Sequence, residues 1–139
     1  MAGPRTHLRF VGYAAVFDRV DRGGDVIRRG AFARSLAGRK AAVPLLWQHH
    51  PGWVIGQIEQ LAEDQRGLRV MGRIEAKGPV AQRAMALLRA RRVDGLSFGY
   101  RVLAGRTGPV RELTALDLIE VSVVSRPMQP LARVLRVED

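Results

Sequence analysis

The chain contains no cysteine, and this absence excludes several kinds of site. Disulfides, thiolate zinc sites and cysteine nucleophiles all need a residue that the chain does not have. A chain without cysteine is also in keeping with a reducing compartment, and we expect the protein to be located in the cytoplasm. Lysine is scarce as well: only Lys40 and Lys77 occur among 23 basic residues, so arginine carries nearly all of the positive charge.

Long apolar runs are also missing. No stretch approaches the roughly 18 apolar residues that a membrane helix needs. The N-terminus, MAGPRTHLRF, lacks the apolar core of a signal peptide. We therefore expect a protein that neither spans a membrane nor binds one.

The charge is strongly positive, with a formal net value of +10. Such a balance can attract nucleic acid or an acidic protein surface. The arginines are scattered, with short pairs only at 28–29 and 91–92, and aromatic residues make up just 6% of the chain. Nucleic-acid-binding domains usually concentrate their basic residues, and single-strand binders add stacking aromatics. A basic nucleic-acid-binding barrel is therefore an alternative function and not the leading one.

A chain of 139 residues without repeats or a linker predicts one domain spanning residues 1–139. Pro79 and the periodic apolar residues after it predict a helix, and Gly12 predicts a kink in the first strand. Strands are expected at 7–20, 43–48, 54–64, 67–76, 95–105, 113–125 and 131–137, and helices at 31–39 and 79–92. Many strands with two helices and no regular βαβ alternation indicate an α+β fold, built on an antiparallel β-barrel or a strongly curled sheet.

Ser97 is the most conspicuous of the four serines, because glycines stand two residues to either side of it in GLSFG. The pattern is that of the hydrolase nucleophile elbow, but that motif needs a helix directly after the serine. Here a strand continues, and no histidine follows Ser97, so an α/β-hydrolase is excluded. Glycines in a strand also allow a substrate or another backbone to approach closely. Ser97 is thus either a nucleophile on another scaffold or a buried, hydrogen-bonded hydroxyl.

A serine nucleophile needs a base, and the chain has three histidines, His7, His49 and His50. His7 lies near a terminus. The adjacent pair follows a strand, where neighbouring side chains point to opposite faces, so we expect only one of the two to meet Ser97 and the pair to have different roles. A two-histidine metal site would need a further ligand and is a minor alternative. Asp18, Asp21 and Asp25 lack the spacing of a calcium loop.

Glu120 is the acid inside the apolar strand LDLIEVSVVS. A carboxylate in such a run is costly unless it is paired. Its partner is either the imidazole of the base or one of the many arginines.

Five blocks in this order resemble the prohead maturation proteases of tailed phages and of gene transfer agents. The blocks are GYAAVFDRVDRGGDVIRRGAF, VPLLWQHHPGWVIG, DQRGLRVMGRI, VDGLSFGY and LDLIEVSVVSRPMQPLA. The resemblance implies a herpesvirus-protease-like fold, a bent barrel with surrounding helices. It also implies that Ser97 is the nucleophile, His49 the base and Glu120 the third catalytic residue, with no cofactor or metal. His50 stands where the family usually has Asp or Asn.

The implied function is a serine endopeptidase that processes the major capsid protein, its scaffolding segment and itself inside an assembling procapsid in the bacterial cytoplasm. Self-association, and contact with nucleic acid through the basic surface, are secondary expectations. The main alternative from another class is a non-catalytic capsid-assembly module of the same fold.

Overall fold

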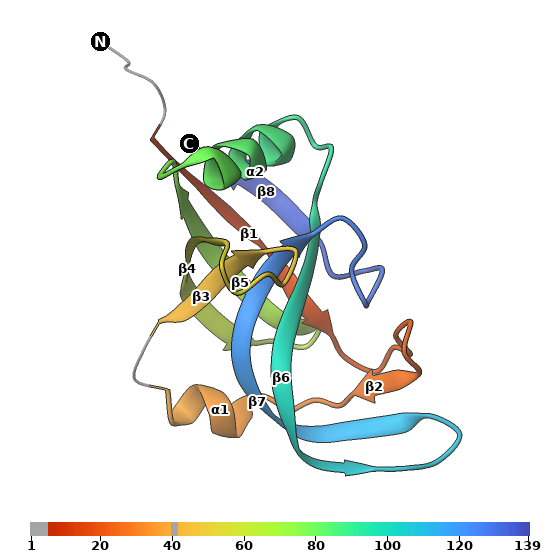
Figure 1. Ribbon diagram of the computed structural model, residues 1–139. Helices are drawn as coiled ribbons and strands as arrows, with labels where there is room; N and C mark the ends of the chain where they lie inside the picture. Colours follow the sequence, from red (N-terminus) through yellow and green to blue (C-terminus); the bar gives the residue numbers. More distant parts are fainter. Residues whose placement is uncertain (1–5, 40–41) are drawn as a thin grey trace.

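A computed structural model describes residues 6–39 and 42–139, which form one mixed sheet and two helices (Figure 1). The described ranges do not include Lys40 or residues 1–5, which are the first half of the N-terminal segment MAGPRTHLRF. In chain order the elements are β1 (His7–Val16), β2 (Asp25–Ile27), α1 (Ala33–Ala37), β3 (Val43–Trp47), β4 (Val54–Glu63), β5 (Gly67–Glu75), α2 (Pro79–Arg89), β6 (Gly95–Arg106), β7 (Arg111–Val124) and β8 (Val134–Glu138). No helix in the described ranges combines the length and the apolar character required to cross a membrane.

The strands follow the order β2-β7-β3-β4-β5-β1-β8, and β6 pairs with β7. Most pairs are antiparallel, as expected, and include the β4–β5 hairpin. The pairs β2–β7 and β3–β7 are parallel, and β7 lies between these two strands, which come much earlier in the chain. The expected α+β class with a curled, mainly antiparallel sheet is confirmed.

The curled sheet brings β6 back to the segment that precedes β8. Leu96 N–H donates to the Ala132 carbonyl at 2.9 Å, and Tyr13 N–H donates to the Arg133 carbonyl at 3.1 Å. The expected irregularity at Gly12 is present, since the β1–β8 register shifts there. A Cβ on Gly12 would lie 2.3 Å from the Arg133 carbonyl oxygen, so only glycine permits this close approach.

The core fills the inside of this sheet, and the two helices lie at opposite ends of it (Figure 1). Pro79 stands at the start of α2, as predicted. An N–H in the first turn of a helix has no acceptor within the helix, so proline, which lacks this group, is tolerated there. One face of α2 is buried, with Ala81, Ala84, Met85 and Leu88 at helical spacing. Full burial of a side chain such as Met85 or Leu88 contributes about 1.5–3 kcal/mol.

One strand was not expected from the sequence. Strand β2 lies outside the predicted strands, and it forms by pairing with Arg111–Leu113 far along the chain. Strands β6 and β7 agree with the expected ranges to within two residues. Residues 101–106 of β6 are all exposed, and the hairpin of β6 and β7 projects from the body of the molecule (Figure 1).

Candidate active site

His49 lies in a tight turn directly after β3. Gln48 and His49 have φ angles of 53° and 59°, in the left-handed region that residues with a side chain rarely adopt. The turn is held by the His50 N–H, which donates to the Trp47 carbonyl, and by the Gln48 N–H, which donates to the Val123 carbonyl of β7 at 2.9 Å. Backbone strain of this kind is maintained only where surrounding contacts enforce it, and it is common at functional sites.

His50 has other partners. Its ring stacks on Trp53 with centroids 4.1 Å apart, and its Nδ1 accepts a hydrogen bond from the Gly52 N–H at 3.1 Å. The two histidines therefore have different contacts, as expected. The cause is the left-handed turn and not the alternation of a strand, because both residues lie beyond the end of β3.

Ser97, Glu120 and Ser122 share one face of the β6–β7 pair. Ser97 lies directly opposite Ser122, and Glu120 is two residues before Ser122 on the same strand. Side chains at opposite positions, and at alternate positions along a strand, point to the same side of a sheet. All three residues are buried, and Ser122 is fully so.

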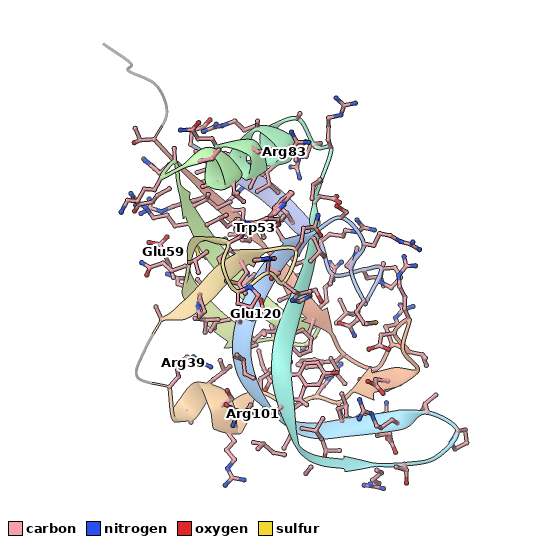
Figure 2. All side chains as sticks on the ribbon, in the orientation of Figure 1. Arg39, Trp53, Glu59, Arg83, Arg101 and Glu120 are labelled. Carbon is pink, nitrogen blue, oxygen red and sulfur yellow. The ribbon has the colours of Figure 1, made fainter. Side chains whose placement is uncertain are left out.

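The His49 ring reaches this face from its turn. Its Nδ1 lies 2.5 Å from Glu120 Oε1, and Glu120 lies in the middle of the molecule in Figure 2. Ser122 completes the network: its hydroxyl donates to Glu120 Oε2 at 2.7 Å and accepts from the His49 backbone N–H at 3.1 Å. With Nδ1 donating to the carboxylate, Nε2 of His49 is left as an acceptor. Glu120 thus pairs with imidazole and not with arginine.

The glycines around Ser97 make space for this arrangement. A Cβ on Gly99 would lie 2.6 Å from Glu120 Oε1, so the glycine leaves room for the carboxylate beside His49. A Cβ on Gly95 would lie 2.6 Å from the Val124 carbonyl oxygen. The GLSFG pattern therefore reflects close packing against β7 and not a nucleophile elbow.

Ser97 and His49 line the same pocket, which has a volume of about 110 Å³. The Ser97 hydroxyl has no hydrogen-bond partner within the described ranges. The rest of the pocket wall combines the apolar side chains of Ala14, Ile27, Leu96, Phe98 and Met128 with the polar ones of Asp21, Tyr100 and Gln129. Burial raises the pKa of Tyr100, and the nearby Asp25 carboxylate raises it further, so this phenol stays neutral at physiological pH. The arrangement places a hydroxyl and an oriented imidazole around one small cavity.

A larger cavity of about 360 Å³ lies over β4 and β5, far along the sheet from Ser97. Its lining contains neither a serine nor a histidine. The smaller pocket is therefore the better candidate for catalysis.

Two glutamines that the sequence analysis did not single out hold the loop between β7 and β8 against the pocket. The Gln48 side chain makes two hydrogen bonds to Ser125. Its Nε2 donates to the Ser125 hydroxyl at 2.5 Å, and its Oε1 accepts from the Ser125 N–H at 3.1 Å. The Gln129 amide bonds both backbone groups of Val16, at 2.7 and 2.8 Å. Ser122 was also missed, although its place two residues after Glu120 in a strand was a usable signal. Nothing local to the sequence points to Gln48 or Gln129.

The three aspartates of the 18–25 segment each have a structural partner. Asp21 Oδ1 accepts from the N–H groups of Gly23 and Asp25, Asp25 pairs with Arg111 at 2.7 Å, and Asp18 pairs with Arg28 at 3.0 Å. Across the described residues, no group of three or more histidine or acidic side chains is placed to hold a metal ion.

Comparison with known proteins points to one family. The model of the caudovirus prohead serine protease family matches residues 3–138. The prohead protease of Enterobacteria phage HK97 is 35% identical over 94 residues, which cover 67% of this chain and 42% of that protein. The chain thus spans less than half of the length of this relative.

Solved structures show the same fold at low sequence identity. A protease of Kaposi's sarcoma herpesvirus, solved with a hexapeptide phosphonate inhibitor, superposes with a TM-score of 0.67 at 16% identity, covering 96% of this chain and 65% of that one. The capsid assembly protease of bacteriophage T4 superposes with a TM-score of 0.62 at 15% identity, covering 84% and 80%. The herpesvirus-protease-like fold expected from the sequence is confirmed.

Proposed function

The chain belongs to the caudovirus prohead serine protease family, and we propose that it is a serine endopeptidase of prohead maturation. In this proposal Ser97 is the nucleophile, His49 the general base and Glu120 the residue that orients the imidazole. The observation that carries it is the 2.5 Å contact between His49 Nδ1 and Glu120, made beside the pocket that His49 shares with Ser97.

Catalysis begins when a peptide carbonyl enters the pocket over Ser97. The Ser97 hydroxyl attacks the carbonyl carbon, and its proton passes to Nε2 of His49. The imidazolium then gives this proton to the leaving amine as the C–N bond breaks, which leaves an acyl-enzyme on Ser97. Water, deprotonated by His49, attacks the ester and releases the second product. Glu120 stays ionised throughout and stabilises the imidazolium.

The free hydroxyl of Ser97 is compatible with this role. Hydrogen bonds between nucleophile and base are often long in a free enzyme and tighten when substrate binds. His49 keeps 42% of its side chain exposed, whereas only 11% of the Glu120 side chain is exposed. The base can therefore reach a bound substrate while the orienting carboxylate is shielded from water.

The proposed substrates are the major capsid protein with its scaffolding segment, and the protease itself, inside an assembling procapsid in the bacterial cytoplasm. The net charge of +10 favours association with an acidic scaffold segment. Self-association and weaker contacts with packaged DNA are secondary parts of the proposal.

The test is co-expression with the major capsid protein of the same gene cluster, followed by intact mass measurement. We expect the wild type to shorten the capsid protein at one site and Ser97→Ala to leave it whole, because the variant lacks the attacking oxygen. Ser35→Ala, a serine on α1 that hydrogen-bonds β7 away from the pocket, is the matched control and should cut as the wild type does. Equal cutting by Ser97→Ala would refute the assignment, and assembly without any cutting would favour a non-catalytic module.

A further inference from the structure

A second cavity, of about 310 Å³, lies next to the proposed catalytic pocket. Its lining residues are Val16, Arg19, Val20, Gln129, Pro130 and Leu131. Gln129 lines the catalytic pocket as well, so the two cavities share a wall. Figure 1 shows the two segments that form the second cavity, the β1–β2 turn and the β7–β8 loop, on the same side of the molecule. We call the cavity the Val20 groove.

The walls of the Val20 groove are tied to each other. The buried Gln129 amide bonds the Val16 backbone, as described above. Arg22, in the β1–β2 segment, makes two more hydrogen bonds to the loop. Its backbone N–H donates to the Met128 carbonyl and its Nε donates to the Pro127 carbonyl, both at 3.0 Å. Because both walls are fixed, the groove exists before any ligand arrives, which lowers the entropic cost of binding.

The chemistry of the groove is apolar with one positive charge at its rim. Val20 and Leu131 expose 58% and 44% of their surfaces, which is unusual for aliphatic side chains lying this close together. Arg19 is exposed, and its guanidinium makes no ion pair with any residue in the described ranges. Asp18, the nearest acid in sequence, pairs with Arg28 and Arg29 instead. The charge of Arg19 is therefore free for an external partner.

We propose that the Val20 groove binds the substrate chain beside the cleaved bond and selects an apolar residue with an acidic neighbour. The inference rests on the proposed function, because it is continuity with the catalytic pocket that identifies the occupant. A peptide held over Ser97 continues past Gln129 into the groove, where Val16, Val20 and Leu131 surround an aliphatic or aromatic side chain. Arg19 then pairs with an aspartate or glutamate next to it.

The test is cleavage of a library of random peptides with blocked ends, with sequencing of the products. For the wild type we expect an apolar residue at one fixed position, separated from the cut bond, and an acidic residue next to it. Val20→Glu should remove the apolar preference, with a loss of about tenfold in kcat/KM for such peptides. Arg19→Glu should replace the acidic preference by a preference for lysine or arginine, by about threefold or more.

A change of preference cannot result from misfolding, so Arg19→Glu tests the groove even if its overall activity falls. Arg83→Glu, an exposed arginine of α2 at the far end of the molecule in Figure 2, is the control for charge. Leu135→Glu, half-exposed on β8 and outside both cavities, is the control for apolar surface. Both controls should keep the wild-type preference.

The outcomes separate the two proposals. If cleavage depends on Ser97 but Arg19→Glu and Val20→Glu keep the wild-type preference, the groove proposal is wrong and the protease assignment stands. If cleavage does not depend on Ser97, the proposed function fails and the groove proposal fails with it. If the two variants change only self-association, measured by sedimentation, the groove is an interface between copies and the substrate proposal is overturned.

Discussion

At the scale of single residues, the proposed site depends on one fully buried hydroxyl. Ser122 donates to Glu120 and accepts from the His49 backbone, so it connects the strand that carries the acid to the turn that carries the base. Buried polar groups are nearly always satisfied in this way, because an unpaired one costs about 1–3 kcal/mol. In the proposed mechanism Ser122 therefore positions Glu120 and His49 and is not the nucleophile.

Ser122→Ala should lower kcat by about tenfold or more while KM stays nearly unchanged, since the variant leaves Glu120 and the left-handed turn less constrained. Stability should fall by about 1–3 kcal/mol, because a carboxylate oxygen and a backbone N–H lose their partner. Steady-state kinetics on a cleaved peptide and urea unfolding measure the two effects. Ser35→Ala removes a hydroxyl that also accepts a hydrogen bond from a β7 N–H, and should lower stability without changing kcat. Equal kcat values for the two variants would contradict the positioning role.

At the scale of elements, the β7–β8 loop forms part of both cavities and is held at its start and at its middle. Gln48 bonds Ser125 at the start, and Gln129 bonds Val16 from the middle of the loop. Gln48 directly precedes His49, so the loop and the histidine turn are coupled through adjacent residues. The Gln129 side chain pairs with Val16 as a neighbouring strand would, because its amide accepts from the N–H and donates to the carbonyl of this one residue.

Gln129→Leu should destabilise the protein by about 1–3 kcal/mol for each backbone group of Val16 that loses its partner. The Val16 amide should also exchange its hydrogen faster, because the loop separates from β1. Urea unfolding and hydrogen exchange measure these changes. Gln82→Leu, on the exposed face of α2, is the control and should leave both unchanged. Normal Val16 protection in Gln129→Leu would show that the amide bonds are not what holds the loop.

At the scale of the whole molecule, net positive charge opposes the compact state, and a few carboxylates offset it locally. Asp25 on β2 and Arg111 on β7 make two parallel hydrogen bonds, at 2.8 and 2.7 Å. The bonds from Arg111 lower the pKa of Asp25 below its ordinary value. This pair joins the short strand β2 to the sheet, at the base of the projecting hairpin.

We expect the stabilising effect of the Asp25–Arg111 pair to be lost in acid. Because the folded-state pKa of Asp25 is lowered, its contribution is fully present above the unfolded pKa, about 3.9, and is lost as the pH falls through the folded value. Asp25→Asn should therefore be less stable than the wild type at pH 7, and the difference should shrink as the pH is lowered below about 4. Urea unfolding at a series of pH values measures it. A difference that is constant with pH would show that the effect is not ionic, and a double-mutant cycle with Arg111→Gln isolates the coupling.

Local pattern was enough to predict most of the elements. The helix from Pro79, the β4–β5 hairpin and the long strand around Glu120 follow from capping, turn chemistry and periodicity that act over a few residues. Strand β2 was missed because its three residues stand between turns and become a strand only by pairing with Arg111–Leu113. The parallel pairings were missed for the same reason.

The sequence by itself determined most of the elements and the positive charge, because these depend on composition and short-range spacing. It also limited the candidates for the proposed acyl transfer to a few residues, which the resemblance of five blocks to prohead proteases then selected. Only the tertiary structure decided which of them meet. His49 and Glu120 are 71 positions apart, and their contact needs a left-handed turn after β3 and the register of β3 on β7. The same register places Ser122 between Glu120 and the His49 backbone, whereas His50 stacks on Trp53 within its own turn. The packing of the whole sheet sets the strand register and the handedness of the turn, so neither can be predicted from a short stretch of the chain.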